Sequence, residues 1–318
     1  MTTNAHSRLR PDLVERYTTR LTTSPVGCAF LATAHAAGMS PDDIVEPTTA
    51  LHLLGAAAEQ INPHAQDLLE RTVEALSRGP RLTRLARQLM QLPEAQAWWA
   101  PLDRERQVWT SLSSSVRSPD SGFYFDAPMP EPSPGRFFVV TSTQVADVAS
   151  LDLAWDWDMA MDPMGDESPI PRQRMAVSPT ARVYEIREFD DWRELVRAYP
   201  YDRRDTDQDH VFRRENPAYD WAIREVTLDR SRAAQDWDGI HLTFSGVLLT
   251  SGIIGPVGTG WTRIVTGSEY THWLNRVVNS ESSLPDVDSL PDLNRFDRQS
   301  MPMPIQDAVL FPDQSDTR

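Results

Sequence analysis

Residues 181–200 carry the strongest local pattern in the chain, because a strand pattern is followed directly by a helix pattern. Residues 182–187 alternate between two faces, as a strand does. Asp190 and Asp191 then supply a helix N-cap, and apolar residues recur at helical spacing up to a proline. The pattern predicts a strand that feeds a short amphipathic helix, with Glu185 on a strand face that is otherwise apolar.

The first hundred residues contain repeated helix start signals. A capping residue precedes a proline at several places, and proline is favoured at the first position of a helix. A glycine-proline pair at 79–80 separates two further helices, the second over residues 81–92. The capped pairs are Ser24-Pro25, Ser40-Pro41 and Asn62-Pro63. Short connections between such helices favour an antiparallel bundle.

Strand patterns dominate the chain after residue 100. We expect strands near residues 106–109, 137–143, 175–187, 240–249 and 261–265, with a proline-rich loop at 118–135. The sequence therefore predicts an α+β fold. A helical bundle (1–100) precedes a mixed α/β domain with a short-stranded sheet (101–280), and residues 281–318 are expected to form a disordered acidic tail.

Two further patterns lie within the expected strands. Residues 240–245 alternate, which predicts Ile240, Leu242 and Phe244 facing inward and His241, Thr243 and Ser245 facing outward. The glycine-rich stretch 252–260 is not followed by a helical pattern, as a dinucleotide-binding loop would require. A hairpin or surface loop is expected there.

Composition excludes several function classes. All 31 basic residues are arginine, so a P-loop lysine, a lysine Schiff base and a lysine general base are impossible. The net charge of −15 argues against nucleic-acid binding, which needs a basic face. The sequence has no apolar run of the roughly 18 residues that a membrane span needs. It also lacks a signal-peptide pattern, so a cytoplasmic location is expected.

No metal site is expected. Cys28 is the only cysteine, which excludes a cysteine-based zinc cluster. The acidic stretch around Asp156 and Asp158 does not match a calcium-binding loop, because Ala160 and Met161 occupy its fifth and sixth positions. Three histidines in the helical region, His35, His52 and His64, do not pair at the spacing that places two ligands on one helix face.

An arginine on a short strand (Arg106, or Arg104 beside it) is followed by a hydroxyl-rich strand and then by a downstream glutamate. This order of residues resembles the ADP-ribosyltransferase family. The hydroxyl residues are Thr141, Ser142 and Thr143. The candidate glutamates, Glu185 and Glu269, follow Val183 and Gly267 by two residues, where the family usually carries Glu or Gln.

The resemblance implies a site for NAD as substrate. The arginine and the hydroxyl strand would hold NAD, and Glu185 or Glu269 would stabilise the positive charge of the ribose as nicotinamide leaves. The chain would then be a transferase or an NAD glycohydrolase. Its candidate residues should converge on one cleft.

Two alternatives remain open at this stage. A non-catalytic adaptor or assembly protein would bind a protein partner through the tail 281–318 and through some of the ten tryptophans, and it should expose an aromatic patch. The other alternative is an enzyme of specialised metabolism whose chemistry the sequence does not reveal.

Overall fold

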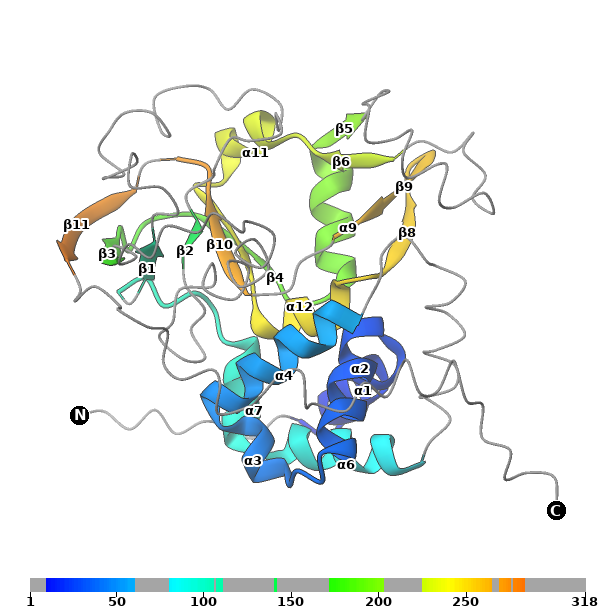
Figure 1. Ribbon diagram of the computed structural model, residues 1–318. Helices are drawn as coiled ribbons and strands as arrows, with labels where there is room; N and C mark the ends of the chain where they lie inside the picture. Colours follow the sequence, from blue (N-terminus) through cyan, green and yellow to red (C-terminus); the bar gives the residue numbers. More distant parts are fainter. Residues whose placement is uncertain are drawn as a thin grey trace, which may run out of the picture.

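The computed structural model describes residues 10–60, 80–105, 107–110, 140–141, 172–202, 225–264, 269–275 and 277–283. The expected helix after Asn62-Pro63, the proline-rich loop, the acidic stretch around Asp156 and most of the tail 281–318 lie outside the described residues. Helices come first and a mixed region of strands and helices follows, so the predicted α+β fold is confirmed (Figure 1).

The helical region begins each of its described α-helices at a proline. These are α1 (Pro11–Thr23), α2 (Pro25–Ala36), α3 (Pro41–Val45), α4 (Pro47–Gln60), α6 (Pro80–Gln91) and α7 (Pro93–Gln96), followed by the 3-10 helix η1 (Ala97–Trp99). None of the described helices is both long enough and apolar enough to cross a bilayer.

Proline sets the sharp corners between these helices. A residue before proline is disfavoured in the helical conformation, so a helix that meets a proline must stop one residue earlier. Ser24, Glu46 and Leu92 are such residues, and each is the sole connection between two helices. Their ψ values of 144°, 126° and 133° lie outside the helical range. Consecutive helices therefore change direction over a single residue, which packs them against one another.

A seven-stranded sheet forms the main part of the second region. Its order is β11-β3-β1-β2-β10-β7-β4, and among its pairs only β4 with β7 is parallel. The bounds are β1 (Gln107–Thr110), β2 (Val140–Thr141), β3 (Arg172–Val177), β4 (Val183–Ile186), β7 (Gly239–Leu242), β10 (Tyr270–Trp273) and β11 (Val278–Ser283).

Two small antiparallel pairs accompany the sheet. The pair β5 (Pro200–Asp202) and β6 (Val226–Leu228) lies within the crossover from β4 to β7, together with α9 (Phe189–Ala198) and α11 (Arg230–Asp236). The pair β8 (Ile254–Val257) and β9 (Gly260–Arg263) is the hairpin expected from the glycine-rich stretch. Gly258 has φ +57° at its turn, a conformation that glycine adopts without strain.

The strand and helix predicted at 182–198 are present, with a different cap. The N-cap is Glu188, whereas Asp190 or Asp191 was expected. Asp191 is the third helical residue, and its carboxylate accepts hydrogen bonds from the backbone N–H groups of Arg187 (2.8 Å) and Glu188 (3.1 Å). A carboxylate at this position can close a capping box, so the helix begins earlier than the aspartates suggest.

The strand expected to run to residue 249 is wrong in its second half. Strand β7 ends at Leu242, and α12 (Phe244–Thr250) follows at once. Thr243 caps α12 through a hydrogen bond from the Gly246 N–H to its hydroxyl (2.9 Å). Every residue of α12 is buried, so the helix has no polar face. Its apolar run 247–249 therefore shows no helical period in the sequence.

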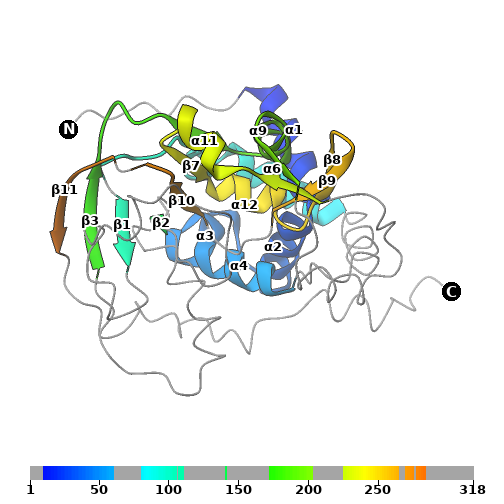
Figure 2. The same ribbon diagram turned by 90° about the horizontal axis from the view of Figure 1, so that it is seen from above.

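Helix α12 lies where the bundle meets the sheet (Figures 1 and 2). The ring of Phe244 is 5.0 Å from that of Trp98 and 6.3 Å from that of Phe30, and both of these residues belong to the helical region. The Ser24 hydroxyl donates to the Leu248 carbonyl at 2.7 Å. A single hydrophobic core therefore continues from the bundle into the sheet region.

Gly246 permits the closest backbone approach in this junction. A Cβ atom added there would lie 2.3 Å from the Ile186 carbonyl oxygen, which is backbone and has little freedom to yield. We expect Gly246→Ala to lower the free energy of unfolding by about 1–3 kcal/mol, as overpacking does. Urea denaturation measures this. Gly38→Asn is the control, because Gly38 (φ +69°) has open space around it and asparagine tolerates that conformation, so an equal loss in both variants would contradict the assignment.

Candidate functional site

One row of residues crosses the centre of the sheet. Glu185 on β4 is paired with His241 on β7, His241 with Thr271 on β10, and Thr271 with Thr141 on β2. Paired residues on adjacent strands share a face, so the backbone register brings polar positions from four strands into one line.

His241 binds two carboxylates, one at each ring nitrogen. Its Nδ1 lies 2.6 Å from Oε2 of Glu185, and its Nε2 lies 3.3 Å from Oε1 of Glu269. Glu185 also accepts a hydrogen bond from the backbone N–H of Leu102 through Oε1, at 3.0 Å. An imidazole donates from both nitrogens only when it is protonated, so the geometry is that of an imidazolium between two anions.

Electrostatics agree with this geometry. Burial of His241 opposes its charge, but the hydrogen bonds to Glu185 and Glu269 and the attraction of both carboxylates outweigh this effect. The pKa of His241 is raised from the ordinary 6.5 to about 9. The imidazole therefore stays charged at neutral pH, although its side chain has no exposed surface.

The neighbouring His272 is held in the opposite charge state. It lies next to Thr271 on β10 and is buried, and the positive charge of Arg230 acts on it. Burial first, and then Arg230, lower its pKa well below 6.5. Two histidines on adjacent strands thus differ in charge because one is close to carboxylates and the other to a guanidinium.

The predicted outward orientation of His241, Thr243 and Ser245 is wrong. All three side chains are fully buried. Strand β7 has neighbours on both sides and all four of its residues are buried, as in strands covered on both faces. Alternation of apolar and polar residues therefore did not mark a solvent face; the side chains of His241, Thr243 and Ser245 form hydrogen bonds inside the protein instead.

An open hollow of about 470 Å³ lies beside this cluster. Residues from the segment after η1 line it together with the end of β3 and the turn that follows. Its lining is Leu102, Asp103, Arg104, Glu105, Ala176, Val177 and Pro179. Leu102 joins the hollow to the site, since its side chain lines the hollow and its N–H binds Glu185.

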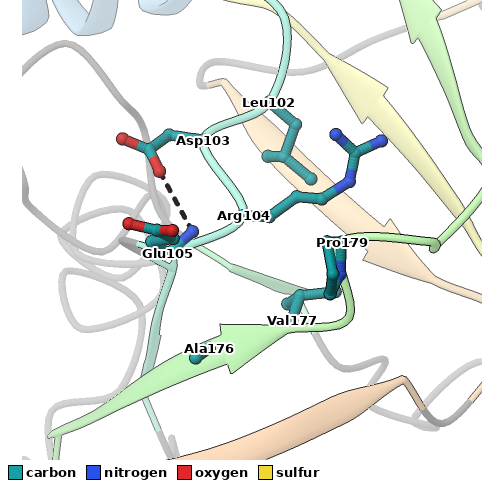
Figure 3. A pocket seen from close by; sticks show the side chains of 7 residues that line it. All are labelled: Leu102, Asp103, Arg104, Glu105, Ala176, Val177 and Pro179. Atoms are coloured by element: carbon teal, nitrogen blue, oxygen red, sulfur yellow. Dashed lines mark hydrogen bonds between the residues drawn. The ribbon is translucent and has the colours of Figure 1, made fainter.

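The side chain of Arg104 points away from the acidic residues that line the hollow. Figure 3 shows its side chain extending past Leu102, away from the carboxylates of Asp103 and Glu105. Its Nη2 donates to the Ala181 carbonyl at 3.0 Å, and its backbone carbonyl accepts from the Val177 N–H at 2.8 Å. The guanidinium is therefore fixed close to the start of β4, the strand that carries Glu185.

The glutamate–histidine–glutamate set is not arranged as a metal site. The two carboxylates bind opposite nitrogens of one imidazole, so the three groups do not converge on one point. Within the described ranges, no group of three or more His, Cys, Asp or Glu side chains is placed to hold a metal ion.

The structure brings both candidate glutamates together, and it places Thr141 in the same cross-strand row. Arg104 lines the adjoining hollow. The candidates Arg106, Ser142 and Thr143 lie outside the described residues.

His241 and Leu102 were not among the site residues expected from the sequence. A histidine between isoleucine and leucine, in a short run bounded by Gly239 and Thr243, was the available signal for His241. The backbone N–H of Leu102 leaves no signal in a sequence.

We expect His241 to titrate with a midpoint near pH 9 in an NMR titration of the ring protons of the seven histidines. Its signal is the one that disappears in His241→Gln. Because the pKa is raised on folding, the stability that the charge contributes is complete below pH 6.5 and is lost as the pH rises through about 9. A midpoint at or below 6.5 would show that the imidazole is neutral.

Comparisons with known proteins found no relative of this chain. Protein-family models, curated protein sequences and solved structures were compared with the chain, and none matches. The arrangement of Glu185, His241 and Glu269 and the hollow beside them are therefore the features that indicate a function.

Proposed function

We propose that the protein is an NAD-consuming enzyme that cleaves the bond between nicotinamide and ribose, as an ADP-ribosyltransferase or an NAD glycohydrolase does. The observation that carries the proposal is the fixed carboxylate of Glu185. It is held by His241 on one oxygen and by the Leu102 N–H on the other, and Leu102 lines a hollow of about 470 Å³ that could take part of a dinucleotide.

The chemistry requires a carboxylate of this kind. Positive charge develops on the ribose as nicotinamide departs, and an anion already fixed in place stabilises that charge without reorganising. Glu185 has two hydrogen bonds that set its orientation, and 14% of its side chain remains exposed to a substrate. The reaction adds water or another acceptor to the ribose carbon and releases nicotinamide.

Arg104 supports the same proposal. It is a fixed cation in the lining of the hollow, and NAD carries a pyrophosphate that an arginine recognises by charge-assisted hydrogen bonds. The guanidinium points away from the carboxylates of Asp103 and Glu105, so the phosphates would bind on the arginine side (Figure 3).

An adaptor function has less support from the described residues. The hypothesis of partner binding through tryptophans requires exposed rings, but five of the ten tryptophans are buried in the core. These are Trp98, Trp99, Trp192, Trp261 and Trp273.

We expect the purified protein to release nicotinamide from NAD and Glu185→Gln to lose roughly 10²–10³-fold in kcat, the loss typical of removing one charge-stabilising group. Glutamine keeps the shape of the side chain and removes its charge. Nicotinamide is quantified by chromatography.

Glu194→Gln is the matched control, because Glu194 is an exposed glutamate on α9 and its substitution should leave the rate unchanged. Absence of nicotinamide release from the wild-type protein, together with no thermal stabilisation by NAD, would reject the proposed function. Equal rates for Glu185→Gln and wild type would reject the role of Glu185.

A further inference from the structure

The two carboxylates that bind His241 differ in their access to a substrate. The side chain of Glu185 is 14% exposed and binds a backbone segment that lines the hollow, whereas that of Glu269 is 2% exposed and binds the opposite nitrogen of the imidazole. Glu185 is therefore the more accessible carboxylate and is joined to the lining of the hollow through Leu102, while His241 lies between Glu185 and Glu269.

We propose that Glu269, His241 and Glu185 form a positioning chain, in which Glu269 keeps His241 protonated and His241 holds the Glu185 carboxylate in one orientation. The proposal rests on the proposed function for the reaction that Glu185 serves. Of the three residues only Glu185 touches substrate, and Glu269 and His241 are positioning residues.

The two hydrogen bonds of His241 are the evidence that it positions Glu185 and is itself held by Glu269. With both ring nitrogens bound, the imidazole cannot rotate without breaking a contact to one of the two glutamates. No surface of the ring is exposed, so water does not replace a lost partner easily. The 2.6 Å contact to Glu185 is short, as expected of a charge-assisted hydrogen bond, and it weakens if His241 becomes neutral.

The charge of His241 depends on both glutamates. Among the described residues, the ionisable groups that act on it are Glu185 on β4 and Glu269, which directly precedes β10. Burial favours the neutral imidazole, so removing one of the two anions shifts the balance toward loss of the proton. Glu269 thus influences Glu185 without contacting the substrate.

The test follows two NMR signals, the His241 ring protons and the ¹³C-labelled carboxyl carbon of Glu185, as the pH rises. We expect Glu269→Gln to lower the His241 midpoint by about one unit or more. The Glu185 signal should inflect at the same lower pH. In nicotinamide release, kcat should fall roughly 10²-fold with KM little changed, and the alkaline limb of kcat should move to that pH.

Glu225→Gln is the matched control, because the Glu225 side chain is also largely covered (14% exposed) and its carboxylate pairs with Arg263 rather than with His241. This substitution should change neither the midpoints of the His241 and Glu185 signals nor the alkaline limb of kcat. If Glu269→Gln does not fold, Glu269→Asp, which keeps the charge at a greater distance, should shift both signals in the same direction by less.

An unchanged His241 midpoint in the Glu269 variants, or a midpoint that moves without the Glu185 signal, overturns the positioning chain. So does an alkaline limb that stays in place while the midpoint moves. Failure of the wild-type protein to release nicotinamide rejects the proposed function instead, and the two NMR titrations still decide whether the chain of three residues is coupled.

Discussion

Burial of α12 is the constraint on which both parts of the molecule depend. This helix has no exposed residue, its first ring packs against Phe30 and Trp98 of the bundle, and its Gly246 lies against the backbone that leaves β4. It follows β7 after one capping residue, so the packing that fixes α12 also fixes the ends of β4 and β7. The bundle therefore determines where the polar centre of the sheet lies.

A second connection runs from the bundle to the same centre. The ring of Tyr17 on α1 lies 4.6 Å from that of Trp99, and the chain continues from Trp99 to Leu102 over three residues. Leu102 then donates its N–H to Glu185. The carboxylate is held from the sheet side by His241 and from the bundle side by Leu102, so its orientation reports how the two regions are packed.

Local signals in the sequence predicted the elements that begin or end with a distinct residue, such as the proline-initiated helices and the strand and helix around Glu185. They failed for α12 and for His241. A helix buried on all sides has no apolar stripe, and a strand covered on both faces has no solvent-facing positions, so neither has the period that prediction relies on. The two glutamates were candidates from the sequence, but their meeting at one imidazole depends on strand order, which is a property of the whole fold.

The prolines that begin the helices also act on the denatured ensemble. Each one restricts φ even when the chain is unfolded, so less conformational entropy is lost on folding, typically by about 0.4–1 kcal/mol per compatible site. With six such positions in the described helices, part of the bundle's stability originates outside its native contacts. The bundle's interior contacts are therefore not the only source of its stability, and some of those contacts are made with α12, a helix that belongs to the other region.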